Sequence, residues 1–224
     1  MKTFIIGITG GVGSLVARSL RDRGDEVAGL VRRHAQIAEV SEYGAEGRVG
    51  DLTKLDSQQL ADLVGSADTI IYTAGAGGSD LDATTAIDRD GVVKAIAAAH
   101  TAGVSRFVLV SVFPDAWRDR DESESFEYYI RMKKEAEIAL TKSGLDWVIL
   151  RPAALQDDPA RGTVALGPAE THDEITRADV AETLVALAHE ARISQQIFEL
   201  NSGDTPINEA VSANVRPIAQ STSR

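Results

Sequence analysis

Cysteine is absent from this 224-residue chain. Disulfide bonds, thiolate nucleophiles and cysteine-based metal sites are therefore excluded. Histidine is also scarce, and its four occurrences are scattered without a spacing typical of metal ligands: His34, His100, His172 and His189. We therefore expect no metal site.

Positive charge is in short supply. The 23 lysine and arginine residues are outnumbered by 34 aspartate and glutamate residues, which gives a net charge of −11. A nucleic-acid-binding protein needs basic surface to neutralise phosphates, so we do not expect a nucleic-acid partner. This charge is still compatible with an anionic small ligand, because a local pair of arginines can outweigh a diffuse acidic field.

Long hydrophobic runs are also missing. No segment approaches the roughly 18 apolar residues of a membrane span. The stretch FIIGITGGVGSLVA, residues 4–17, has some likeness to a signal peptide, but four glycines interrupt it and a charged helical pattern follows directly. We therefore expect a cytoplasmic protein without a membrane partner.

What the chain does contain is a regular alternation of short β-branched segments and helical patterns, with 43% hydrophobic and 25% charged residues. This alternation predicts βαβ units around a parallel sheet, that is, a three-layer doubly wound α/β fold of the Rossmann-like type. The expected strands are TFIIGIT, EVAGLVR, AEGRVGDL, SADTIIYTAG, SRFVLVSV and LDWVILRP, and three helices between them are expected to end at Gly24, Gly103 and Gly144.

The pattern changes after residue 150. Residues 151–214 are rich in proline and glycine, and we expect a short strand at GTVAL, a helix capped by Thr176 in a near capping box with Asp179, the strand QQIFEL and a closing helix. We interpret residues 1–214 as one domain, whose part 151–214 covers the end of the sheet where a substrate would bind. Residues 215–224 are expected to form a loose polar tail.

The segment GITGGVG lies between the first expected strand and the first expected helix. It places Gly7, Gly10 and Gly13 three residues apart. A helix start offers unpaired N–H groups and a positive dipole end, and glycines let a diphosphate approach the backbone closely. This strand–turn–helix context predicts a dinucleotide site, whereas the alternative is a tight turn needed only for packing.

The end of the second expected strand indicates which dinucleotide is bound. An NAD site usually has an acidic residue there, whereas this strand ends in LVRR, with Arg32 and Arg33. Guanidinium groups suit a 2′-phosphate, so we expect NADP in preference to NAD, unless both arginines are merely solvated. Asp51, after the third strand, could accept a hydrogen bond from the adenine amine or cap the next segment.

Three polar residues are candidates for chemistry. Ser111 ends the fifth expected strand, at the sheet edge where ligands lie in such folds. Tyr129 and Lys133 follow in FEYYIRMKKEAE, four residues apart and so on one helix face. A nearby ammonium is expected to lower the tyrosine pKa and favour proton transfer, although a chance Tyr-x-x-x-Lys pair in a charged helix is the alternative.

The chain resembles an atypical short-chain dehydrogenase/reductase of the NAD(P)-binding group, which includes flavin- and biliverdin-reductase-like and epimerase/dehydratase-like proteins. The similar segments span nearly the whole chain and include GITGGVGSLVARSLRDRGDEVAGLVRR, VGDL, IIYTAGAGG, YIRMKKEAEIALTKSGLDWVILRP and EITRADVAETLVAL. One departure is VSVF after the fifth strand, where the family often has two serines and this chain has Ser111 alone.

The resemblance implies a role for residues in several segments. Those implied to contact the nucleotide are Gly7, Thr9, Gly11, Val12, Arg32, Arg33, Asp51, Leu52, Ala74, Gly75 and Lys133. Those implied in catalysis are Ser111, Tyr129 and Lys133. Apart from the resemblance, Trp117 and Phe126 in the loop 113–127 could either line a pocket or pack that loop down. His172 could face substrate or be a surface or structural residue, and Arg151 with Pro152 could shape the cleft floor.

Three functions are compatible with this pattern. The first is an NADPH-dependent reductase or dehydrogenase of a small carbonyl, quinone or flavin-like substrate. The second is a nucleotide-binding sensor without turnover, and the third is a relative of the nucleotide-sugar epimerases and dehydratases. The presence of Ser111, Tyr129 and Lys133 together favours an enzyme, because a pure sensor needs no proton donor. The sequence leaves monomer and homodimer equally open.

Overall fold

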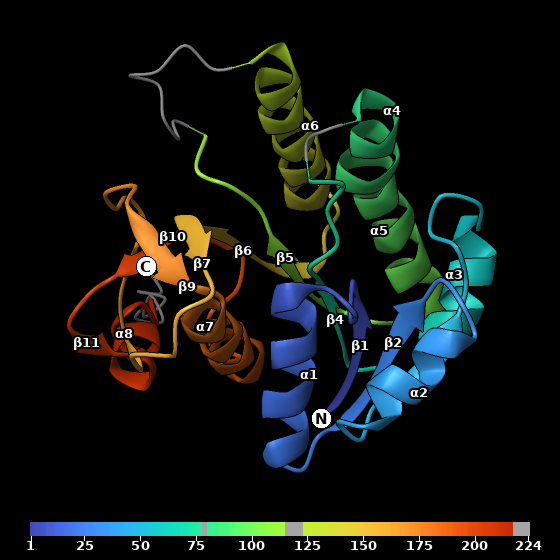
Figure 1. Ribbon diagram of the computed structural model, residues 1–224, viewed down its shortest axis with the longest axis horizontal. Coiled ribbons are helices and arrows are strands. Elements are labelled where there is room, and N and C mark those ends of the chain that lie inside the picture. The colour runs from blue at the N-terminus through green and yellow to red at the C-terminus, as the bar shows by residue number, and fades with distance from the viewer. Residues whose placement is uncertain (78–79, 115–122, 217–224) are drawn as a thin grey trace, which may run out of the picture.

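A computed structural model of the protein describes residues 1–77, 80–114 and 123–216. Its centre is a nine-stranded sheet in the order β11-β8-β10-β6-β5-β4-β1-β2-β3 (Figure 1). These strands are β1 (Lys2–Ile6), β2 (Glu26–Val31), β3 (Glu46–Val49), β4 (Thr69–Tyr72), β5 (Arg106–Val110), β6 (Asp146–Pro152), β8 (Thr163–Gly167), β10 (Gln196–Ser202) and β11 (Thr205–Pro206). A separate parallel pair consists of β7 (Ala154–Gln156) and β9 (Glu174–Thr176).

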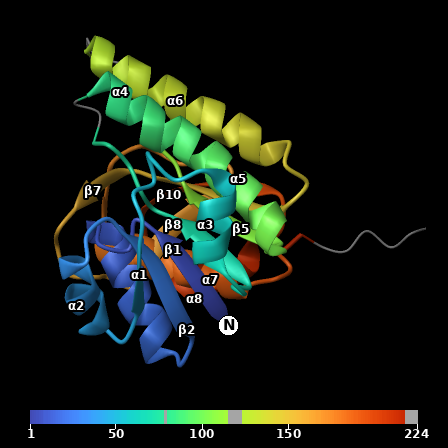
Figure 2. The ribbon, with the colours of Figure 1, turned by 90° about the vertical axis from the view of Figure 1, so that its right-hand side faces the viewer.

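Helices cover both faces of the sheet (Figure 2). They are α1 (Gly11–Asp22), α2 (Ala35–Ser41), α3 (Ser57–Val64), α4 (Leu81–Thr84), α5 (Asp90–Ala102), α6 (Glu124–Thr141), α7 (Arg177–His189) and α8 (Ile207–Ala213), with a π-helix, η1 (Thr85–Arg89), joining α4 to α5. No helix in the described ranges is long and apolar enough to cross a membrane.

The predicted three-layer, doubly wound fold is confirmed. Every pairing from β3 through β10 is parallel, and β8 and β11 add an antiparallel edge. Side chains of alternate β1 residues point to opposite faces of the sheet and pack in two separate hydrophobic cores. Ile5 packs with α1 and α7, whereas Phe4 and Ile6 pack with α3, α5 and α6. Because β1 lies between β2 and β4, the chain reverses direction across the sheet at this strand, which is where such folds bind ligands.

The expected strands all form, and the three helices with predicted ends are each followed by the predicted glycine. The residues at Gly24, Gly103 and Gly144 adopt positive φ angles of 86°, 72° and 76°. The short helices α2, α3 and α4 were not predicted, although α3 carried a sequence signal: Asp56 accepts from the Gln59 backbone, and the Gln59 side chain accepts from the Asp56 backbone, in a capping box.

The C-terminal part contains more structure than predicted. The expected strand at GTVAL is present as β8, but the β7–β9 pair was missed because three-residue strands show no clear period. Thr176 caps α7 as expected, accepting from the Asp179 backbone. The reciprocal half of a capping box is not formed, since the Asp179 carboxylate accepts from the Thr176 hydroxyl at 2.7 Å and from the backbone of Arg161 and Gly162, which holds that turn.

Candidate active-site cleft

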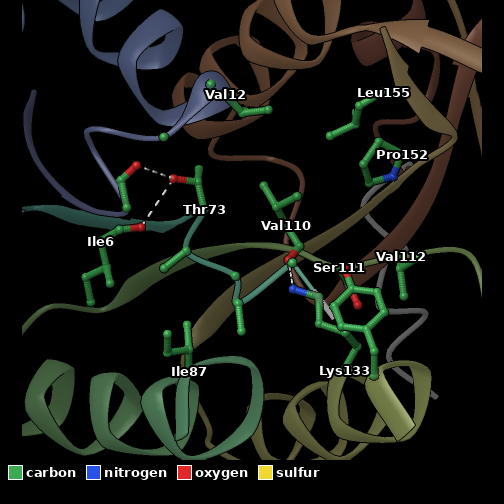
Figure 3. A pocket seen from close by; sticks show the side chains of 18 of the residues that line it. Ile6, Val12, Thr73, Ile87, Val110, Ser111, Val112, Lys133, Pro152 and Leu155 are labelled. Atoms are coloured by element: carbon green, nitrogen blue, oxygen red, sulfur yellow. Dashed lines mark hydrogen bonds between the residues drawn. The ribbon is translucent and has the colours of Figure 1, made fainter. Parts of the chain in front are cut away.

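A cleft of about 940 Å³ lies over the carboxyl ends of the parallel strands (Figure 3). It receives residues from the turns after β1, β2, β3, β4, β5 and β6, and from α6 and the start of α7. The predicted site residues in its lining are Gly7, Thr9, Gly10, Gly11, Val12, Arg32, Asp51, Leu52, Ala74, Gly75, Ser111, Tyr129 and Lys133. Gly13 and Arg33 do not line it.

The glycine turn is shaped by close contact with the end of β4. Gly7 has a φ of 99°, and a Cβ atom there would lie 2.6 Å from the Ala74 backbone nitrogen. Figure 3 shows Thr73 donating from its hydroxyl to the carbonyl oxygens of Ile6 and Gly7, at 3.2 and 3.3 Å. Gly10, the N-cap of α1, provides no side-chain cap. The first-turn residues Gly11 and Val12 line the cleft, so their uncapped backbone amides are available to a diphosphate there.

Gly13 has a packing role instead of a ligand contact. A Cβ atom at this position would lie 2.1 Å from the Gly7 carbonyl oxygen and 2.7 Å from Thr73 Oγ1. The third glycine of the motif thus allows the helix and the turn to pack closely, which is the role expected of the last glycine in such motifs.

The loop after β2 carries the two predicted arginines. Both side chains are exposed, and within the described residues neither guanidinium has a hydrogen bond or ion pair. Their backbone amides donate to Gln36 Oε1 at 3.0 and 3.1 Å, and Gln36 Nε2 donates to Thr9 Oγ1 at 3.4 Å. Gln36, which sequence reasoning missed, therefore ties this loop to the glycine turn and leaves Arg32 directed at the cleft.

Asp51 does not cap a helix, since Asp56 is the N-cap of α3. Its carboxylate accepts from the Thr53 backbone nitrogen at 3.0 Å and from the Thr53 hydroxyl at 2.8 Å. The Thr53 hydroxyl lowers the pKa of Asp51, so the carboxylate stays ionised in the cleft wall.

Lys133 is buried at the cleft wall, where Figure 3 places it beside Val110. Its Nζ donates to the Val110 carbonyl oxygen at 2.9 Å and lies 3.5 Å from Asp88 Oδ1. Asp88 is fully buried in the π-helix, and its other carboxylate oxygen accepts from the Ala76 backbone at 3.0 Å. Asp88 thus connects the lysine to the loop after β4, and sequence reasoning did not find it.

Ser111 is 5% exposed, and its Oγ has no hydrogen-bond partner among the described residues. A buried hydroxyl without a partner is uncommon, because desolvating it costs free energy that a hydrogen bond would recover. Its place in the cleft beside Lys133 (Figure 3) suits it to bind a ligand oxygen.

The structure distinguishes Tyr129 from its neighbour. Tyr129 lines the cleft with Lys133 Nζ 5.9 Å from its ring centre. The Tyr128 hydroxyl instead hydrogen-bonds to Thr85 Oγ1 at 2.6 Å, which links α6 to the π-helix. Lys134 is exposed. The structure thus places the predicted pair, Tyr129 and Lys133, in the lining of the cleft, and their part in catalysis stays a prediction.

The net shift of the Tyr129 pKa is upward, because burial outweighs the Lys133 ammonium, which lowers that pKa as predicted. Burial raises the pKa of the Tyr129 hydroxyl; the Lys133 ammonium lowers it, but the Asp88 carboxylate raises it again. Desolvation is the largest of these effects, and the Asp88 charge adds to it, so the Lys133 charge does not offset them. Tyr129 is therefore a neutral phenol at neutral pH.

The substrate side of the cleft is largely apolar. Phe126, Leu155 and Pro152 line it, together with His172, whose ring meets Phe113 edge-on at 5.0 Å. His172 thus faces the cleft. Trp117 lies outside the described residues.

Arg151 does not form the cleft floor. It is buried, and its Nε and Nη2 donate to the two carboxylate oxygens of Glu137 at 2.9 and 2.7 Å. Arg177, which sequence reasoning also missed, does line the cleft beside the glycine turn.

Residues 7–191 match the sequence profile of the NAD(P)H-binding family. The chain belongs to the NAD(P)H-binding family. A relative in Bacillus subtilis, the uncharacterized sugar epimerase YhfK, is 36% identical over 213 residues, covering 94% of this chain and 99% of YhfK. The predicted resemblance to atypical short-chain dehydrogenase/reductases is therefore confirmed.

Solved structures resemble this NAD(P)H-binding protein closely. A candidate NAD-dependent epimerase/dehydratase from Bacillus halodurans superposes with a TM-score of 0.87 at 30% identity, covering 95% of this chain and 99% of that one. ChuY, an anaerobillin reductase from Escherichia coli O157:H7, superposes with a TM-score of 0.77 at 26% identity, covering 91% of this chain and 98% of ChuY.

The cleft fits a nicotinamide dinucleotide. The uncapped start of α1 offers backbone donors to a diphosphate, and the glycines leave room for it because side chains there would collide with the turn. Near the glycine turn, Arg32 offers a guanidinium and Asp51 offers an ionised hydrogen-bond acceptor. Lys133 and Ser111 offer polar groups at the other end of the cleft.

Proposed function

We propose that this protein is an NADPH-dependent oxidoreductase that reduces a small carbonyl, quinone or flavin-like substrate. One observation carries the proposal: a single cleft joins the glycine turn to Ser111, Tyr129 and Lys133. Its similarity to ChuY, which is an anaerobillin reductase, supports a reductase. The unengaged guanidinium of Arg32, where NAD sites usually have an acid, supports NADPH over NADH.

Each residue has a distinct task in this proposal. NADPH, when bound, supplies a hydride. Tyr129 donates its phenolic proton to the substrate oxygen, and Ser111 Oγ donates a hydrogen bond to the same oxygen to orient it. Lys133, held by the Val110 carbonyl, stabilises the phenolate that remains and offers its ammonium to a ribose hydroxyl. The apolar side chains around Leu155 exclude water from the reacting atoms.

The raised pKa of Tyr129 predicts the pH dependence of reduction. A proton donor must be protonated, so turnover should be constant through neutral pH and fall only at alkaline pH, as the pH passes the raised Tyr129 pKa. The Asp88 carboxylate contributes to raising that pKa, so Asp88→Asn should move the alkaline limb to lower pH. Steady-state kcat against pH measures this.

The control for Asp88→Asn is Glu135→Gln, which removes a carboxylate of α6 whose ion-pair partner among the described residues is Arg89, at 3.3 Å on the surface. The pH profile of this variant should match that of the wild type. An Asp88→Asn profile that is unchanged, or displaced to higher pH, in a protein with normal thermal unfolding would contradict the assignment of Tyr129 as donor.

Arg32→Ala should reduce the preference for NADPH over NADH by about tenfold, because it removes charge-assisted hydrogen bonds to the 2′-phosphate. Arg33→Ala is the matched control and should have a smaller effect, since Arg33 does not line the cleft. Titration calorimetry with both dinucleotides measures the two affinities. Equal preference in Arg32→Ala and wild type would remove Arg32 from the site.

The activity itself is tested by following NADPH oxidation with panels of carbonyls, quinones and flavins. Turnover of any class that depends on Tyr129 supports the proposal. Binding of neither NADPH nor NADH to the wild-type protein would refute it.

A second candidate is a nucleotide-binding sensor without turnover. The favouring observation is that Lys133 already has two partners, the Val110 carbonyl and Asp88, which hold its ammonium where it can anchor a ribose without proton transfer. Tight NADPH binding with no turnover on any panel, and the same binding in Tyr129→Phe, would favour the sensor.

The epimerase alternative rests on the description of YhfK as a sugar epimerase. In that case the protein would interconvert nucleotide sugars with bound NADP and no net consumption of NADPH. Product analysis of a nucleotide-sugar panel separates this activity from a reductase.

A further inference from the structure

Arg177, the first residue of α7, lies over the glycine turn. A Cβ atom at Gly11 would be 3.0 Å from Arg177 Cδ and 3.3 Å from Arg177 Nε. The arginine lines the same cleft as the turn, although it comes from the C-terminal part of the chain. A methyl group at Gly11 would therefore press on the arginine side chain and make it shift slightly.

The present partners of Arg177 are weak. Its Nη1 donates to Asp157 Oδ1 at 2.7 Å and to the Leu155 carbonyl oxygen at 3.4 Å. The Asp157 side chain is 87% exposed, so water competes fully for this ion pair. A ligand with more negative charge in a less exposed place can therefore displace Asp157.

The positively charged side chains of the cleft lie at separate places along its length. Among the described residues of the lining, the lysine and arginine side chains are Arg32, Lys133 and Arg177. Arg32 follows β2, and Lys133 is held near the end of β5 by the Val110 carbonyl. Arg177 is the one that contacts the turn in front of α1, where the first-turn amides point.

We propose that Arg177 binds the diphosphate of the dinucleotide, exchanging Asp157 for it when the cofactor enters. This inference rests on the proposed binding of NADPH in the cleft. The α1 amides and the guanidinium then contact the diphosphate from two directions, and the guanidinium neutralises its charge.

Two fragments of the cofactor separate this role from that of Arg32. ADP-ribose has the diphosphate but no 2′-phosphate, and adenosine 2′-monophosphate has the reverse. Arg177→Gln should weaken NADPH and ADP-ribose binding by about tenfold and leave adenosine 2′-monophosphate unchanged. Arg32→Ala should show the opposite pattern with the two fragments. Titration calorimetry on the full-length protein gives each dissociation constant.

Two further variants control for misfolding and test whether the diphosphate replaces Asp157 as the partner of Arg177. Arg177→Lys keeps the charge and should retain part of the ADP-ribose affinity, with thermal unfolding like that of the wild type. Asp157→Asn removes the competing carboxylate and should tighten ADP-ribose binding by up to about threefold.

The outcomes distinguish this inference from the proposed function. A wild-type protein that binds neither NADPH nor ADP-ribose overturns both. A wild type that binds both, with Arg177→Gln equal to it, overturns the Arg177 assignment alone. Equal weakening of adenosine 2′-monophosphate in Arg177→Gln, or weaker ADP-ribose binding in Asp157→Asn, also overturns it.

Discussion

Tyr129→Phe is expected to lower kcat by about 10²- to 10⁴-fold, the range that a positioned general acid contributes. The variant loses only the phenolic hydroxyl, so the ring still packs against Phe126, 6.2 Å away between ring centres. The affinity for NADPH should therefore stay within about twofold of the wild type, because nothing that binds the dinucleotide is removed. Steady-state kinetics on the substrate found by the panel, together with calorimetry, measures both quantities.

Tyr128→Phe is the matched control, one residue away on the same helix. It removes the hydrogen bond to Thr85 and should cost about 1 kcal/mol of stability, with kcat unchanged. If Tyr129→Phe turns over as fast as the wild type, Tyr129 is not the proton donor. If kcat falls by a similar factor in both variants, the cause is displacement of α6 as a whole.

Gly13→Ala is expected to destabilise the protein by about 1–3 kcal/mol, the usual cost of overpacking a tight site. A Gly→Ala substitution inside a helix ordinarily stabilises a protein, since alanine in a helix is favoured over glycine by about 1 kcal/mol. At Gly13 we expect the opposite effect on stability. The reason is that the new Cβ would lie 2.1 Å from the Gly7 carbonyl oxygen, so the turn must move away from the helix. Urea unfolding gives the change in free energy.

The same movement should weaken NADPH binding, because the α1 amides lose their alignment with the turn. Ser14→Ala, at the next position of the helix, is the control and should alter stability by less than about 0.5 kcal/mol. A Gly13→Ala protein as stable as the wild type, with full NADPH affinity, would show that the close packing at Gly13 is not needed.

Patterns of residues close together in the sequence predicted much of the candidate site. The glycine spacing, the strand that ends at Ser111 and the helical register of Tyr129 and Lys133 depend on residues close together in the chain. Such patterns follow from backbone geometry, because strand ends meet at one sheet edge and residues four apart share a helix face. The cleft brings these residues together as that geometry predicts.

Residues joined only by distant contacts were not predictable in this way. Asp88 lies in a π-helix that has no sequence signature, and only the packing of that helix against α6 brings it 3.5 Å from Lys133. The net direction of the Tyr129 pKa followed from that contact and from burial. Gln36 and Arg177 likewise reach the glycine turn from segments far along the chain.

The sequence by itself determined the fold class, the place of the glycine turn and the common helix face of Tyr129 and Lys133, because periodicity and strand order need no knowledge of distant contacts. The tertiary structure alone decided that Gly13 packs while Gly11 faces the cleft, that Arg32 and not Arg33 lines it, and that Lys133 is shared with Asp88. These depend on distances and burial between separate elements, and electrostatic effects follow such distances directly.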